Sequence, residues 1–220
     1  MTDPRLELPR PAPGAGTYRY LLNGEVTPVT EEFEVPTDPA EAIRSVRRAP
    51  GGVELSVVAE PNGADDADVL VTFHSDSVSE VTARYVLADG RLTVHLHDST
   101  GATSTKEMEA ADGVLSPLLR VFQGPTIAHA IRLGGQCVVA LPDITDPEDP
   151  ARLLQPVMEM RRADRLGVET GTGTVLRHCS YVGGNYDDDA GFWLDERDRL
   201  VRYRFPQGPE QLWEVELDES

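Results

Sequence analysis

Apolar and polar side chains alternate along most of the chain. The alternation is clear from Val53 to Glu60, from Ala67 to His74 and from Val81 to Leu87, and it returns at Leu92, Val94 and Leu96. Because successive side chains of a β-strand point to opposite faces, a period of two predicts strands with one buried face. The pattern therefore predicts a protein built mainly from antiparallel strands.

Turn signals separate these apolar runs. Asn23-Gly24 lies between two β-prone runs and predicts a hairpin near the start of the chain, because both residues readily adopt positive φ. Near the end, Asp195 to Arg199 and Pro206 to Pro209 divide three further alternating runs, which predicts a closing meander of three strands.

One segment departs from the alternation. Gly113 to Ile131 is strongly apolar, and its apolar side chains recur at spacings of three and four, as they do on a helix. Gly124-Pro125 interrupts the segment, which predicts either a helix with a break or two short helices.

Many short strands around one apolar helical segment predict a mainly β fold. We expect a curved antiparallel sheet, or a lipocalin-like barrel or half-barrel, that wraps around the helical segment or is capped by it. The proline-rich residues 1–16 are expected to form a disordered tail, and residues 17–217 a single β-rich domain with a ligand cavity.

The composition excludes several classes of partner. The chain has 38 acidic and 20 basic residues and a formal charge of −18, which repels nucleic acid and anionic membrane surfaces. Cys137 and Cys179 are too few for a disulfide framework, and the N-terminus lacks the apolar run of a secretory signal. We therefore expect a cytoplasmic protein that binds neither nucleic acid nor membranes.

Metal and cofactor sites are not predicted. His95 and His97 share one strand face, as a pair of metal ligands would, but the opposite face carries Leu92, Val94 and Leu96. The apolar face is the buried one, so both histidines should face solvent, and no third ligand with matching spacing is visible. No glycine-rich nucleotide motif is present either.

Reactive side chains gather around residue 178. On a strand, Cys179 and Tyr181 share one face while His178 lies on the other, so the group does not form a nucleophile with its base. His178 and Tyr181 are nevertheless candidate acids, bases or hydrogen-bond donors in a cavity. His129, within the apolar segment, is either a satisfied core histidine or a third catalytic candidate that points into the ligand space.

A resemblance to a known group rests on the stretch from Phe192 to Tyr203. Its pattern of Trp193-x-Asp195, a turn and Leu200-x-Arg202 resembles a hairpin of the bacterial half-barrel lipid carriers, which include the lipoprotein carriers. The resemblance implies an apolar ligand held between a curved sheet and helices. In size and expected architecture the chain is also similar to lipocalin-like barrels of natural-product pathways, which are cofactor-free cyclases.

These observations support two functional hypotheses. In both, an enclosed cavity holds a lipid-like or polyketide-like molecule against aromatic side chains. In the first, the protein is a cofactor-independent cyclase or isomerase; in the second, it is a non-catalytic carrier of a lipid or glycolipid. A completely filled interior would instead favour a structural interaction protein. The expected ligand-binding residues are Tyr85, Phe122, Trp193, Tyr203 and Trp213.

Overall fold

A single curved β-sheet dominates the computed structural model, which describes residues 5–62, 66–98, 100–108, 112–145, 152–170, 174–184, 186 and 189–218. The predicted mainly β class is confirmed. The strands are β1 (Leu6–Glu7), β2 (Gly14–Leu22), β3 (Glu25–Val35), β4 (Ile43–Ala49), β5 (Val53–Pro61), β6 (Ala67–His74), β7 (Val81–Ala88), β8 (Arg91–His97), β9 (Thr103–Met108), β10 (Gly113–Leu115), β11 (Gln136–Pro142), β12 (Pro156–Thr170), β13 (Val175–Val182), β14 (Gly191–Leu194), β15 (Leu200–Pro206) and β16 (Leu212–Asp218), and the helix is α1 (Arg120–Arg132).

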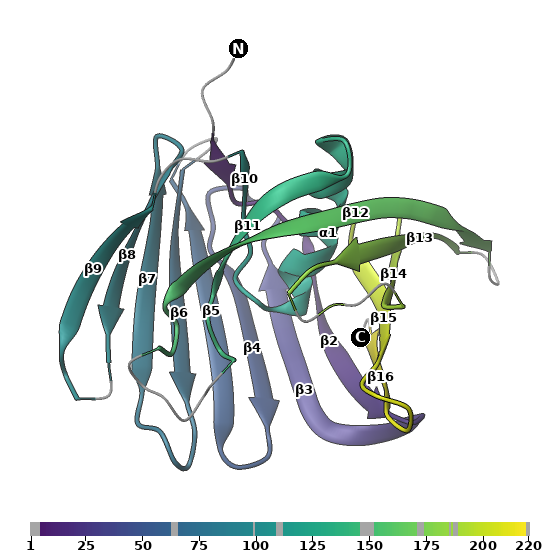
Figure 1. Ribbon diagram of the computed structural model, residues 1–220, viewed down its shortest axis with the longest axis horizontal. Helices are drawn as coiled ribbons and strands as arrows, with labels where there is room; N and C mark the ends of the chain where they lie inside the picture. The colour runs from purple at the N-terminus through teal and green to yellow at the C-terminus, as the bar shows by residue number, and fades with distance from the viewer. Residues whose placement is uncertain are drawn as a thin grey trace.

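The sheet curls over without closing into a barrel. Its order is β1-β10-β11-β12-β13-β14-β15-β16-β2-β3-β4-β5-β6-β7-β8-β9, so β1 and β9 form its two edges. β10 pairs in parallel with β1 and β11, and the other pairs of neighbouring strands are antiparallel. In Figure 1, β12 crosses in front of β4 and β5. Tyr85 of β7 ties the two layers together, because its hydroxyl donates a hydrogen bond to the carbonyl of Leu154, just before β12.

The predicted alternation places the core on one face of the sheet. In β6, every second side chain from Ala67 to Phe73 is buried, and the same holds in β7 from Val81 to Leu87. Val69 and Tyr85 are opposite each other in the two strands, and both are fully buried. The predicted Asn23-Gly24 hairpin is also present, with positive φ at both residues.

The helix is continuous, which corrects the predicted break at Gly124-Pro125. Gly113–Leu115 forms β10, and α1 then runs from Arg120 to Arg132 with Pro125 as its sixth residue. A proline at this position removes a backbone hydrogen bond. The cost is offset by burial, because every residue from Val121 to Ala128 is buried. As predicted, the apolar segment lies inside the curl of the sheet.

Gly124 allows the helix to approach the sheet closely. A Cβ atom at this position would lie 2.2 Å from the carbonyl oxygen of Asp198 and 2.6 Å from the backbone nitrogen of Leu200. Both contacts are to backbone, in the turn after β14 and at the first residue of β15, and backbone cannot move aside as a flexible side chain would. The distance between α1 and this turn therefore requires glycine.

The chain before residue 17 differs from the predicted tail. Leu6 is fully buried, β1 pairs with β10, and β2 already begins at Gly14, so part of this segment belongs to the sheet; residues 1–4 are outside the described part of the chain. The proline content suggested solvated backbone, but the burial of Leu6 outweighs that tendency. No helix among the described residues is long and apolar enough to span a bilayer.

We predict that Gly124→Ala lowers the stability of the protein by about 1–3 kcal/mol, because the added methyl group overlaps backbone atoms. Thermal or urea unfolding measures the effect. Gly167→Ala in β12 is the matched control, since a Cβ atom there meets no atom within 4 Å and should change stability little. Equal stability of the two variants would contradict the close approach of α1 to the turn.

Candidate functional site

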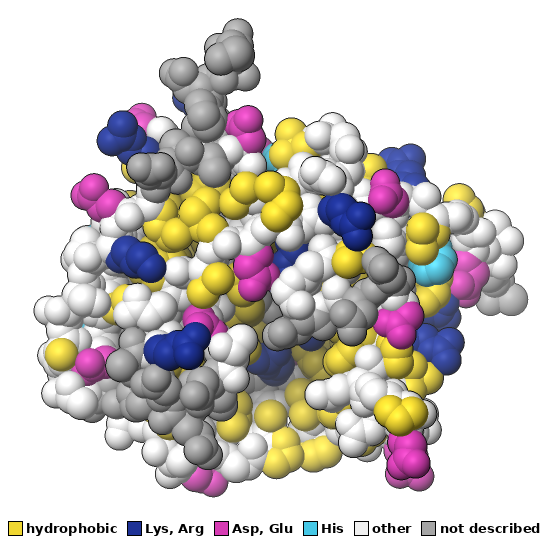
Figure 2. All heavy atoms as spheres, viewed as in Figure 1, with side chains coloured by type: hydrophobic (Ala, Val, Ile, Leu, Met, Phe, Trp, Pro, Cys, Tyr) yellow, Lys and Arg dark blue, Asp and Glu magenta, His cyan; other side chains and the backbone are white. Residues whose placement is uncertain are grey.

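A pocket of about 480 Å³ lies inside the curl of the sheet. This volume falls in the usual range for small-molecule sites. The pocket is bounded by the start of α1, by β4, by β11 and β12, and by aromatic residues of β13 and β15. Figure 2 shows a hollow in this face of the molecule, in which dark blue Lys or Arg atoms lie deep among yellow apolar ones.

Apolar side chains form much of the pocket wall. Leu118 and Leu119 precede α1, Val139 and Leu141 come from β11, and Val157 comes from β12. Since these side chains come from separate elements, the apolar wall depends on the curl of the sheet. A ligand with an apolar portion would gain free energy by covering this surface.

An aromatic cluster forms another part of the wall. The rings of Tyr203 and Phe205 are stacked with centroids 5.0 Å apart, and Tyr203 also stacks on Phe192 at 4.7 Å. Tyr186 meets Tyr203 edge to face at 5.7 Å and approaches Tyr181 at 5.8 Å. These contacts hold the tyrosine side chains rigidly beside the pocket.

Hydrogen-bond donors converge on the hydroxyl oxygen of Tyr186. Nη1 of Arg120 donates to it at 3.0 Å and Nε2 of Gln123 donates at 3.1 Å. Burial by itself raises the pKa of Tyr186, but the charge of Arg120 and these two hydrogen bonds outweigh burial and lower it. For Tyr203, burial, the nearby Tyr186 and a hydrogen bond with Tyr186 raise the pKa.

A buried carboxyl group, Glu31 of β3, lies behind this cluster. Its oxygens accept hydrogen bonds from the hydroxyl of Tyr20, at 3.0 Å, and from the backbone N–H of Arg120. Burial raises the pKa of Glu31, and the charges of Arg120 and Arg47 oppose this rise. Burial also raises the pKa of Tyr20, to about 12. Glu31 thus fixes the position at which α1 begins.

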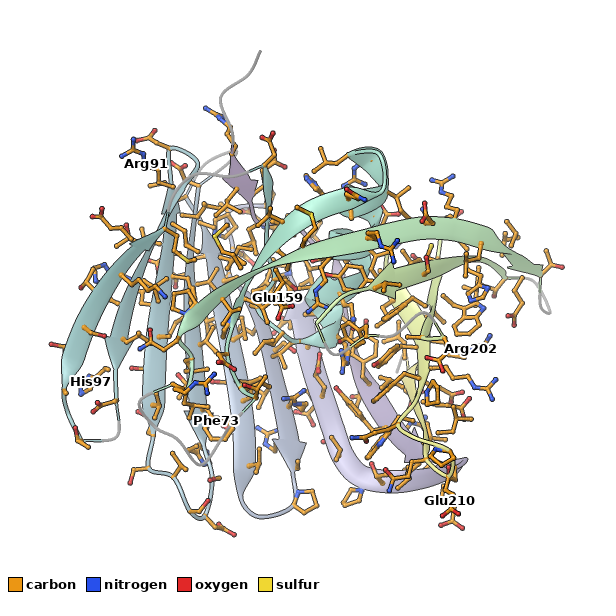
Figure 3. All side chains as sticks on the ribbon, in the orientation of Figure 1. Phe73, Arg91, His97, Glu159, Arg202 and Glu210 are labelled. Carbon is orange, nitrogen blue, oxygen red and sulfur yellow. The ribbon has the colours of Figure 1, made fainter. Side chains whose placement is uncertain are left out.

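Arg161 of β12 brings a second guanidinium group to the pocket. It is 5% exposed, forms an ion pair with Glu159 and donates a hydrogen bond to the carbonyl oxygen of Gly183. Its Cζ lies 5.3 Å from the ring centre of Tyr186 and 5.5 Å from that of Tyr181. Figure 3 shows Glu159 near the centre of the view, where β12 crosses the sheet.

Of the predicted catalytic residues, the structure brings Tyr181 to the pocket and places His178 elsewhere. The opposite orientations expected for these side chains are observed.

His178 stacks on Trp193 with ring centres 4.5 Å apart, and Cζ of Arg202 lies 4.0 Å from the centre of the Trp193 ring. In Figure 3, Arg202 lies at the right of the view, away from Glu159. Trp193 was expected to line the pocket, but it does not, because it alternates with Phe192 on β14 and points to the other face of the sheet.

The other predicted binding residues divide between pocket and core. Tyr203 lines the pocket. Tyr85 and Phe122 are buried in the core instead, Tyr85 with its hydroxyl donating to a backbone carbonyl. Trp213 is partly buried near the start of β16, where its indole N–H donates to Gln207 at 2.9 Å. Tyr85 and Tyr203 lie on buried strand faces as predicted, but such a face contains more core than pocket.

His129, the third catalytic candidate, does not line the pocket. It lies in the second half of α1, with Nδ1 3.7 Å from a carboxylate oxygen of Glu7 in β1. Burial lowers the pKa of His129, and the charge of Glu7 opposes this shift. His129 is therefore a partly buried residue beside Glu7, outside the pocket.

The remaining reactive groups do not add to the site. His95 and His97 are exposed, as their alternation predicts, and in Figure 3 His97 lies at the left-hand edge of the molecule. Burial raises the pKa of Cys137 to about 11 and that of Cys179 as well, so neither thiol is an activated nucleophile. The described residues contain no group of three or more His, Cys, Asp or Glu side chains placed to hold a metal ion.

The polar centre of the pocket was missed by the sequence analysis. Glu31 carried a signal, because it falls in the buried phase of the alternation with Phe33 and Val35. A charged residue in such a phase indicates a buried polar site. Arg120 and Tyr186 carried no comparable signal, because neither lies in a strand with alternating buried and exposed side chains. Arg120 begins α1, and Tyr186 pairs only through an isolated bridge with Gly183.

We predict that Tyr186 ionises at lower pH than any other tyrosine of the protein. A pH titration of tyrosinate absorbance should show an early phase below the ordinary pKa of about 10. Tyr186→Phe should remove this phase, whereas the control Tyr181→Phe should retain it. If every tyrosine ionised with a pKa of about 10 or higher, Tyr186 would not have the lowered pKa inferred from its contacts with Arg120 and Gln123. Burial raises the pKa of the other five tyrosines, Tyr18, Tyr20, Tyr85, Tyr181 and Tyr203.

Comparison with known proteins identifies a similar fold. No family model matches the chain, and no curated protein matches its sequence. Among solved structures, a β-barrel-like protein of a domain of unknown function, DUF1849, from Brucella abortus is similar, with a TM-score of 0.53 and 12% sequence identity. The match covers 96% of this chain and 97% of the other. At this identity the similarity shows a shared barrel-like architecture along nearly the whole chain.

Proposed function

We propose that this protein binds a lipid-like or polyketide-like small molecule in the pocket inside its curved sheet. The observation that carries the proposal is that α1 and the curl of the sheet leave about 480 Å³ unfilled beside an apolar and aromatic wall. A purely structural protein would fill such a space, because interiors are normally close-packed. Binding of this kind needs no catalytic residue, so the proposed function is that of a carrier.

The size of the pocket limits the ligand. If each non-hydrogen atom takes up about as much space as a water molecule, roughly 30 Å³, the pocket holds on the order of fifteen such atoms. A medium-length acyl chain or a compact polyketide has this size. The aromatic side chains Tyr203 and Phe205 would contact it with few rotamers to restrict.

A second candidate function, cofactor-independent proton transfer, is favoured by the environment of Tyr186. A phenol with a lowered pKa is a more effective proton donor and acceptor near neutral pH. In a cyclase or isomerase, it would remove a proton from a carbon next to a carbonyl group and return one at another carbon. This proton-transfer function requires that the pKa of Tyr186 is lowered. If that pKa is ordinary, only the binding function remains as a proposal.

We predict that filling the pocket abolishes binding without unfolding the protein. Prodan, a neutral fluorophore that brightens in apolar surroundings, serves as the probe. Leu141→Trp should weaken prodan binding by at least about tenfold, because the larger side chain occupies the ligand volume.

The control for this experiment is Leu70→Trp, which adds the same side chain at an exposed position of β6. It should bind prodan as the parent does, and both variants should melt as single transitions. Unchanged affinity in Leu141→Trp, or no prodan binding by the parent, would contradict the proposal.

A further inference from the structure

The pocket is rich in positive charge although the protein is strongly acidic. Four arginines and two carboxylate residues line the pocket among the described residues, while the whole chain carries a formal charge of −18. The arginines are Arg47, Arg120, Arg152 and Arg161. A concave surface lined by one sign of charge attracts ligands of the opposite sign.

The two carboxylates are already engaged by two of these arginines. Glu159 forms an ion pair with Arg161, and Asp143 lies 3.6 Å from Nη2 of Arg152. Around the guanidinium group of Arg120, by contrast, no carboxylate of the described chain lies within salt-bridge distance. Arg120 therefore brings to the pocket a positive charge that no described carboxylate pairs directly, although buried Glu31 lies close enough to feel it.

The surroundings of Arg120 explain why this charge is significant. Its Nη1 donates to the side-chain oxygens of Gln123, at 2.7 Å, and Tyr186, at 3.0 Å, and its Cζ lies 4.9 Å from the ring centre of Tyr203. Glu31 accepts a hydrogen bond from its backbone rather than from its guanidinium group. The Nε atoms of Arg120 and Arg161 are both buried without a hydrogen-bond partner in the described structure. Burying a guanidinium N–H group without a hydrogen-bond partner is unfavourable, and a bound anion would remove much of that cost.

We propose that the ligand is an amphiphile with an anionic head group, a carboxylate or a phosphate monoester, held beside Arg120 and Arg161. This inference rests on the proposed binding function and names the ligand class. The guanidinium group matches both kinds of head in geometry and charge. The apolar chain of the ligand then lies along Leu141, Val157 and Phe205, which line the same pocket.

The test compares ligands that share a chain and differ in the head group. Competition with prodan gives the affinities of dodecanoate, dodecyl phosphate and dodecanol. The parent should bind at least one of the two anions about tenfold or more tightly than dodecanol, as a charge-assisted hydrogen bond in a pocket allows. Preference for both anions supports a site for negative charge, and preference for one also identifies the head group.

Variants assign the preference to the arginines. Arg120→Gln should weaken binding of the anions by about tenfold or more and leave binding of dodecanol unchanged, which also shows that the variant is folded. Arg161→Gln provides a second test with the same readout. Arg48→Gln is the control, because Arg48 is exposed and pairs with Glu32 and Glu54 outside the pocket, and it should retain the preference.

Failure of the anionic head group can be distinguished from failure of the binding function. If the parent binds dodecanol and both anions equally, the anionic head group is overturned while the apolar pocket stands. If the preference persists in both arginine variants, the assignment to Arg120 and Arg161 is wrong. If none of the ligands binds, the proposed binding function itself fails.

Discussion

The packing of α1 against the concave face of the sheet determines where the pocket lies and which side chains line it. A sheet of this length must either close into a barrel or cover its apolar face, and here a buried helix covers that face. Gly124 allows the helix to contact the backbone where the turn after β14 leads into β15. Since the helix begins at the pocket, the same packing presents Arg120 and Gln123 to any molecule inside.

The polar groups of the pocket are difficult to explain as contributions to stability. Replacing buried charged groups with apolar ones of similar volume is often neutral or stabilising, so a buried group such as Arg161 or Glu31 has to be accounted for in another way. Places where a sequence departs from simple core packing are commonly functional. The convergence of Arg120 and Gln123 on Tyr186 is such a departure, and it accounts for the lowered pKa of that tyrosine.

The sequence predicted the architecture better than the site, for a physical reason. Period-two alternation reports which face of a strand is buried, so the strands, the inward Tyr203 and the opposite orientations of His178 and Tyr181 followed from it. Alternation does not report whether a buried side chain meets another side chain or a pocket. Tyr85 consequently proved to be a core residue, and Trp193 a residue of the other face. The pocket depends on contacts between distant segments, which no local pattern contains.

A crystal structure of the protein grown with dodecanoate would show directly whether the pocket holds an anionic amphiphile. We expect electron density for the acyl chain between β11, β12 and β15, with the carboxylate within hydrogen-bond distance of the Arg120 or Arg161 guanidinium group. Density with the carboxylate directed away from both arginines would contradict the anionic site. A pocket that stays empty at saturating dodecanoate would contradict both the anionic site and the proposed binding function.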